Sequence, residues 1–340
     1  MKKLISMTLL FMIVLVFTAC NPIEAMNEPV DSSSSELLLV TIPKGASTTK
    51  IASILKTNNL IKNERTFKML SKNLDADGKM KAGDYKFSRN LSSEEIIVKL
   101  VSGQVFIETN TFTIPEGYNN KQIINFLLEK DLIEREAFEK QLSEGAFDYK
   151  FMENVDRTYN LEGFLFPDTY VIKKDASEYD IINVMLKRFN DVFLEQYYGR
   201  LEELNMDINK IITLASIIEK ETVVDREREL VSSVFYNRLD INMKLESCAT
   251  VQYTMDEIKA VLSFEDIAVD NPYNTYKYPG LTPGPIASPG EKSIVAALYP
   301  DDTNFLYFSV SNLGDGSQYF SKTYSEHQLA IKKSKENMSK

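Results

Sequence analysis

Apolar residues between positions 180 and 245 recur every three to four places, which is the spacing of amphipathic helices. Within this region the run ITLASIIEKET, residues 212–222, is an almost continuous apolar helix that ends with two glutamates. At about 100° per residue, Glu221 falls inside the apolar stripe, whereas Glu219 falls away from its centre. We therefore expect Glu221 on the core-facing side, unless the helix frays after Ile218 and Glu221 reaches water.

A carboxylate on the buried side of a helix loses its hydration. Burial disfavours the ionised form, so the pKa of the group rises. A carboxyl group that stays protonated near neutral pH is what a general acid requires. The pattern thus makes Glu221 a candidate acid.

The strand and helix patterns also repeat earlier in the chain. Residues 41–70 and 113–142 align without gaps, 72 positions apart, and about a third of the aligned positions are identical. Each copy predicts a short strand, a Pro-x-Gly turn and a helix. Two copies are too few for a solenoid, so we interpret them as two small modules. The opening of the first, IPKGASTTKIASIL, resembles a LysM-like carbohydrate-binding unit.

The N-terminus begins with lysines, continues with an apolar stretch and ends with small residues, which is the layout of a secretory signal. Its Thr18-Ala19-Cys20 ending resembles a bacterial lipoprotein site, at which Cys20 would be lipidated. The alternative is an uncleaved membrane anchor, because residues 4–23 carry no charge and are just long enough to span a bilayer. In both cases we expect anchoring at the cell membrane and an extracytoplasmic catalytic domain. Cys248 is then left without an intramolecular disulfide partner.

Composition narrows the classes of function. The formal net charge of −10 and the absence of a basic stripe argue against nucleic acid as a partner. A single histidine, His327, and two cysteines leave no basis for a His-rich or Cys-rich metal site. The nucleophile-elbow, P-loop and dinucleotide motifs are missing from the sequence as well. We expect neither a metal nor a cofactor, and we expect His327 to be a solvated or capping residue on a polar C-terminal helix.

Four blocks carry the chemistry: LEGFLFPDTY (161–170), ASIIEKET (215–222), SVFYNRL (233–239) and YNTYKYPGLTPGPIASPG (273–290). In this order and spacing they resemble the signature blocks of the MltG/YceG-like endolytic murein transglycosylases. The resemblance runs from about residue 37 to the C-terminus. That family cleaves the β-1,4 bond between N-acetylmuramic acid and N-acetylglucosamine within peptidoglycan strands. It leaves 1,6-anhydro-muramyl ends and uses one catalytic glutamate.

The resemblance places the catalytic glutamate at the second Glu of the E-K-E-[ST] block, which is Glu221, in agreement with the helical pattern. It also implies peptidoglycan glycan strands as substrate, termination of nascent strands, and cell-wall synthases as partners. The sequence departs from the family at Cys248 and Ala249, where many members have Asp-Pro, so we assign no catalytic aspartate there.

The candidate substrate-binding residues are aromatic, hydroxyl, amide and acidic side chains in or near these blocks: Glu162, Phe164, Phe166, Asp168, Tyr170, Ser216, Thr222, Asn237, Thr250, Tyr253, Asn274, Thr275 and Tyr276. Several have a simpler interpretation. The three aromatic residues of the first block equally suit a hydrophobic core, and its two acids equally suit turns or caps. Asn237 is a candidate to orient an N-acetyl group, whereas we expect its neighbour Arg238 to be structural.

The expected fold class is α+β, with one or more LysM-like modules before a mixed α/β catalytic domain that contains a lytic-transglycosylase-type catalytic helix. We expect a signal peptide or anchor over 1–19 and a Ser/Pro-rich flexible tether over 20–36. The LysM-like module then covers 37–106, a second strand–helix module or connector covers 107–160, and the catalytic domain covers 161–340.

Two other functions stay open from the sequence. A hydrolytic muramidase would pair Glu221 with a second carboxylate, Glu162 or Glu219, because glycoside hydrolases generally use two. A non-catalytic peptidoglycan-binding scaffold would keep the fold without the reaction.

Overall fold

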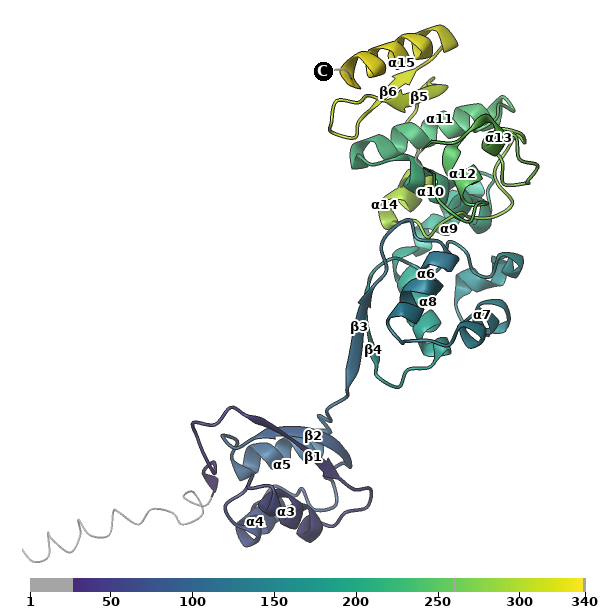
Figure 1. Ribbon diagram of the computed structural model, residues 1–340. Coiled ribbons are helices and arrows are strands. Elements are labelled where there is room, and N and C mark those ends of the chain that lie inside the picture. The colour runs from purple at the N-terminus through teal and green to yellow at the C-terminus, as the bar shows by residue number, and fades with distance from the viewer. Residues whose placement is uncertain (1–26, 260, 339–340) are drawn as a thin grey trace, which may run out of the picture. The chain divides into compact units, whose positions relative to one another are not determined.

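The computed structural model describes residues 27–259 and 261–338. The chain divides into two compact units, with the boundary between Glu108 and Thr109 (Figure 1). The expected signal or anchor and the candidate lipidation site Cys20 lie outside the described residues. Among the described helices, none is both long enough and apolar enough to cross a bilayer.

The first unit has the element order strand, helix, helix, strand, helix. These elements are β1 (Leu37–Ile42), α3 (Thr48–Thr57), α4 (Glu64–Asn73), β2 (Gly83–Ser88) and α5 (Ser93–Ser102). The two strands pair antiparallel along their whole length. One face of this two-stranded sheet and the apolar sides of the helices bury a core of their own, which includes Leu55, Phe67 and Phe87.

The second unit begins with the same order of elements. They are β3 (Thr109–Thr113), α6 (Asn120–Glu129), α7 (Arg135–Glu144), β4 (Thr169–Lys173) and α8 (Glu178–Val192), with β3 and β4 antiparallel. Two short 3-10 helices, η1 (Lys150–Asn154) and η2 (Arg157–Tyr159), are inserted before β4. The sequence repeat is therefore part of a larger structural repeat. Because β3 pairs with β4, residues 109–160 fold together with the segment that follows them.

The rest of the second unit is mainly helical. It contains α9 (Glu195–Glu203), α10 (Ile208–Glu221), η3 (Asp225–Glu227), α11 (Arg228–Asp240), α12 (Cys248–Gln252), α13 (Phe264–Ile267), α14 (Glu291–Leu298), β5 (Tyr307–Val310), β6 (Gln318–Ser321) and α15 (Tyr324–Met338). Helix α10 contacts α11, α12 and α14 (Figure 1). With three small antiparallel sheets among the helices of the described chain, the fold is mixed α/β.

Candidate active site

Helix α10 carries the candidate acid at its last residue. Asp207 caps its N-terminus by accepting a hydrogen bond from the Lys210 amide, and the helix continues to Glu221 without fraying. Every residue from Ile211 to Ile218 is buried, so the centre of the helix is enclosed on all sides. The helix therefore holds Glu221 in a fixed backbone conformation.

The Glu221 carboxyl group has two hydrogen-bond donors. The Ser247 hydroxyl donates to Oε1 at 2.5 Å, and the Ala249 amide donates as well. Burial raises the pKa of Glu221, while these two donors and the nearby Arg238 guanidinium oppose the rise. The net direction is upward, as the helical pattern predicts, and a raised pKa favours the protonated form that a general acid needs.

Ser247, which the sequence analysis missed, is held by two buried threonines. Its amide donates to Thr275 Oγ1 at 3.0 Å, and the Thr275 and Thr250 hydroxyls lie 2.8 Å apart. Thr250 also donates to the Ser247 carbonyl at 2.8 Å. Both threonines are predicted substrate-binding residues, but the structure places them behind the serine that contacts Glu221. The sequence signal that could have pointed to Ser247 is its position directly before the short helix that starts at Cys248, because serine is a preferred N-cap residue.

Asn274 and Tyr276 belong to the Pro-rich loop that lies beside this serine. The Asn274 amide group donates to the carbonyls of Ile267 and Val269 at 2.9 and 2.8 Å, and its side-chain oxygen accepts from the Tyr276 amide. Asn274 therefore shapes the loop. The Tyr276 hydroxyl lies 3.0 Å from the sulfur of Cys248, a free and exposed thiol, and burial, followed by Cys248 and then Glu221, raises the Tyr276 pKa. Tyr276 thus lies at the accessible side of the site.

The structure corrects the expected placement of Glu219. Its side chain is only 7% exposed, because α11 and α14 cover the side of α10 that the helical pattern left outside. Glu219 Oε2 lies 3.4 Å from Arg228 Nη1 and accepts hydrogen bonds from Gly290 N and Ser293 Oγ. This carboxylate is engaged in a buried ion pair.

Glu162 is another buried carboxyl group, and it contacts Tyr253, the residue directly after α12. Its oxygens accept from the Asn120 amide at 3.1 and 3.2 Å and from the Tyr253 hydroxyl at 3.2 Å. Burial raises the pKa of Glu162 to about 7. Glu162 and Tyr253 also line a cavity of about 580 Å³. Both are predicted substrate-binding residues.

The raised pKa of Glu162 predicts a pH-dependent stability. Between about pH 4.5 and 7 the folded state binds a proton that the unfolded state has already lost, so the free energy of unfolding falls as pH rises through this window. Glu162→Gln does not titrate, so its stability relative to wild type should improve by roughly 2–3 kcal/mol between pH 4.5 and pH 8. Urea unfolding of both proteins at the two pH values measures this. If the difference in the free energy of unfolding between the two proteins were the same at both pH values, Glu162 would not have the raised pKa.

The aromatic residues of the first block are core residues. Phe164, Phe166 and Tyr170 are 2%, 5% and 4% exposed, and the Phe164 ring packs 5.1 Å from that of Phe189. No face of these rings is free to stack on a sugar. Asp168, directly before β4, forms an ion pair with Arg188 of α8 at 2.6 Å.

Three further candidates have structural partners or are enclosed. Ser216 is fully buried and accepts from the Ile286 amide at 3.0 Å, which fixes the Pro-rich loop to α10. The Asn237 amide group donates to two carbonyls before β5, those of Thr303 and Phe305. Thr222 is buried, and within the described chain its hydroxyl has no hydrogen-bond partner.

The expectations for Arg238 and His327 have different outcomes. Arg238 is structural, as expected, since it donates to the carbonyls of Leu245 and Leu306 at 2.7 Å. His327 is half-buried rather than fully solvated. Its ring stacks on Tyr307 with centroids 5.1 Å apart, because α15 packs against β5, and burial lowers the His327 pKa.

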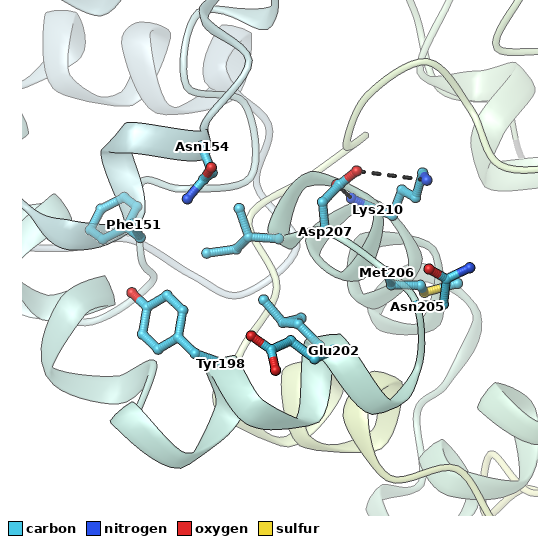
Figure 2. A pocket seen from close by; sticks show the side chains of 10 residues that line it. Phe151, Asn154, Tyr198, Glu202, Asn205, Met206, Asp207 and Lys210 are labelled. Atoms are coloured by element: carbon cyan, nitrogen blue, oxygen red, sulfur yellow. Dashed lines mark hydrogen bonds and ion pairs between the residues drawn. The ribbon is translucent and has the colours of Figure 1, made fainter.

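A smaller groove of about 200 Å³ lies next to the acid. Its wall includes Lys220, which precedes Glu221 in the sequence, and Ala249, whose amide donates to the Glu221 carboxyl group. Tyr253 lines both this groove and the cavity at Glu162. A separate pocket of about 620 Å³ lies at the opposite end of α10 (Figure 2), where Tyr198, Glu202 and Lys210 contribute to its wall. The 14-residue helix is about 20 Å long, so this pocket is remote from Glu221.

Comparisons with known proteins cover most of the chain. Residues 40–333 match the model of the YceG-like family. The chain is 36% identical over 326 residues to an endolytic murein transglycosylase of Bacillus subtilis (strain 168), a match that covers 91% of this chain and 88% of the relative. It is 31% identical to the protein of the same name in Streptococcus pneumoniae serotype 2 (strain D39 / NCTC 7466), covering 89% of this chain but 59% of that longer relative.

A solved structure agrees with these matches. The crystal structure of a yceG-like protein from Listeria monocytogenes aligns with a TM-score of 0.58 and 33% identity, over 87% of this chain and 99% of that one.

Proposed function

Because the chain belongs to the YceG-like family, we infer that it is an endolytic murein transglycosylase that cleaves peptidoglycan glycan strands. The observation that supports the inference best is the single carboxyl group of Glu221, half-buried at the end of α10 and bonded to Ser247. In this proposal Glu221 is the catalytic residue, and the bond cleaved is the β-1,4 bond between N-acetylmuramic acid and N-acetylglucosamine.

The proposed mechanism needs one carboxyl group. Protonated Glu221 donates its proton to the glycosidic oxygen, and the bond to the muramyl C1 breaks with development of oxocarbenium character. The muramyl 6-hydroxyl oxygen attacks C1, and its proton passes to the Glu221 carboxylate, which regenerates the acid. The products are a 1,6-anhydro-muramyl end and a free N-acetylglucosamine 4-hydroxyl. Water is not consumed.

The positions of the other two acids support this mechanism over a two-carboxylate hydrolysis. Glu219 is neutralised by Arg228, and Glu162 is bonded to Asn120 and Tyr253. Within the described chain neither shares a hydrogen-bond partner with Glu221. A base that activates water beside Glu221 is therefore not provided by either acid.

The finer proposals concern location and binding. The first unit has strand–helix–helix–strand order with antiparallel strands, and a cavity of about 410 Å³ lies between its Pro-x-Gly turn and the loop before β2. This arrangement supports a LysM-like module that binds glycan. Lipidation at Cys20, or a membrane anchor in its place, would hold the enzyme outside the membrane, near the synthases whose nascent strands it would terminate.

Product mass tests the reaction. The full chain is incubated with purified uncrosslinked glycan strands, and the new ends are identified by mass spectrometry. Anhydro-muramyl ends, lighter by one water than reducing ends, are expected. Reducing ends would indicate a muramidase, and unchanged strands would indicate a binding scaffold.

Ser247→Ala tests the electrostatics of the acid. The Ser247 hydroxyl stabilises the ionised carboxylate, so its removal should raise the pKa of Glu221 further. We expect the alkaline limb of the pH–rate profile to move upward by up to about one unit and the turnover to fall about tenfold, since a lost hydrogen bond to a charged group is worth about 1.5–3 kcal/mol. Profiles measured from pH 4 to 9 for both proteins test this, and an unmoved limb would contradict it.

A further inference from the structure

The C-terminal hairpin of β5 and β6 reaches the residue that carries the proposed acid. Gln318, the first residue of β6, donates from its side-chain Nε2 to the main-chain oxygen of Glu221 at 2.8 Å. Its own amide N–H donates to Glu227 Oε2 at 3.0 Å. Gln318 therefore connects the last residue of α10 to the residue directly before α11.

The first of these bonds acts where helix α10 needs a partner. The last carbonyls of a helix have no intrahelical donor, and they form the negative end of the helix dipole. The Glu221 carbonyl is one of them and belongs to the same residue as the proposed acid. The Gln318 amide group satisfies it and partly offsets the negative potential beside the carboxyl group.

The hairpin is built to hold this contact. Its turn closes through Ser311 and Ser317, whose main chains bond at 2.8 Å and whose hydroxyls also lie 2.8 Å apart. At Gly316 the turn packs against the connection after α10, since a Cβ there would lie 3.0 Å from a methyl group of Val223. The turn of the hairpin thus contacts the segment that joins α10 to α11.

The side-chain amide group of Gln318 is bonded through its nitrogen and not through its oxygen. Its Nε2 has the Glu221 carbonyl as acceptor, and its Oε1 is buried without a partner in the described part of the chain. An unsatisfied buried acceptor is unfavourable, so the donor bond must hold the side chain in this place against a penalty. This is expected of a side chain whose function is to supply the donor.

We propose that Gln318 is a positioning residue for the transglycosylase reaction: it fixes the end of α10 and adjusts the electrostatic environment of the Glu221 carboxyl group. The proposal rests on the proposed catalytic function of Glu221. Gln318 touches neither the substrate nor the reacting atoms in this account, and it acts through the main chain of Glu221.

Two substitutions separate positioning from folding. Gln318→Met keeps the length of the side chain and removes the donor, whereas Gln318→Glu also adds a negative charge beside Glu221. Both retain the backbone bond to Glu227. The matched control is Tyr319→Phe, the next residue of β6, whose hydroxyl accepts a hydrogen bond from Asn337 at 3.1 Å.

The full-length variants are compared by turnover on uncrosslinked glycan strands, by pH–rate profile and by thermal unfolding, beside Glu221→Gln. We expect Gln318→Met to lower kcat about tenfold with little change in KM, as for one lost hydrogen bond. Gln318→Glu should lower kcat further and move the alkaline limb upward, because the added charge raises the Glu221 pKa. Tyr319→Phe should match wild type.

The outcomes distinguish the two levels of the proposal. Wild-type kcat and pH profile in both Gln318 variants, with Glu221→Gln inactive, would overturn the positioning role alone. Activity losses that follow only the fraction of folded protein, with the pH limb unmoved, would overturn it too. If Glu221→Gln were active, both assignments would be wrong: Glu221 as the acid and Gln318 as the residue that positions it.

Discussion

Glu221→Gln should lower the rate of anhydro-muramyl end formation by on the order of 10²–10⁴-fold, the usual contribution of a general acid. The glutamine has the size of the protonated carboxyl group and can accept the hydrogen bond from Ser247. It has no proton to donate to the glycosidic oxygen and cannot take one from the 6-hydroxyl. Because the raised pKa favours the neutral form of Glu221, the neutral glutamine should leave the stability of the fold nearly unchanged.

Glu219→Gln is the matched control for this experiment. It makes the same chemical change two residues away on the same helix, at a carboxylate that is paired with Arg228. We expect it to lose stability and to keep producing anhydro ends at temperatures at which it is folded. If Glu221→Gln retained wild-type turnover, or if Glu219→Gln lost turnover while folded, the assignment of the acid would be wrong.

The sequence predicted the helix that carries the acid because that information is local. A period of 3.6 residues and an unbroken apolar run place Glu221 toward the interior without reference to any other part of the chain. The strand, turn and first helix of each repeat were predicted for the same reason, since they follow one another directly along the chain, whereas the second helices, α4 and α7, were not predicted. Its returning strands β2 and β4 could not be matched, because the second copy carries an insertion before β4.

Contacts made by distant segments could not be read from the same pattern. Glu219 faces α14, which lies some 70 residues later, so a helical projection of α10 alone leaves it outside. Thr250 and Thr275 resemble binding residues because they are polar and lie near the site. Their buried hydroxyls instead bond each other behind Ser247. A polar side chain in a motif block thus indicates only that the residue lies near the site. Its hydrogen-bond partners show whether it holds other site residues in place or is free to contact the substrate.

The buried pair behind the acid should be the most sensitive point for stability. Arg228→Met would leave the Glu219 carboxylate buried with only the neutral donors Gly290 N and Ser293 Oγ. Removal of one member of a buried ion pair typically destabilises by about 3–5 kcal/mol, because the remaining charge is uncompensated. We expect a loss of that size in the free energy of unfolding, measured by urea denaturation at pH 7.

The double variant Arg228→Met, Glu219→Leu shows whether that loss comes from the charge left behind. With both ionic groups gone, no buried ion pair remains, and the double variant should be more stable than the sum of the losses of the single variants Arg228→Met and Glu219→Leu predicts. Additive losses would mean that packing, and not charge, dominates at this junction of α10, α11 and α14. A non-additive result would mean that the uncompensated charge, and not the lost packing, accounts for most of the loss in the free energy of unfolding, so that the ion pair neutralises a charge which α11 and α14 bury against α10.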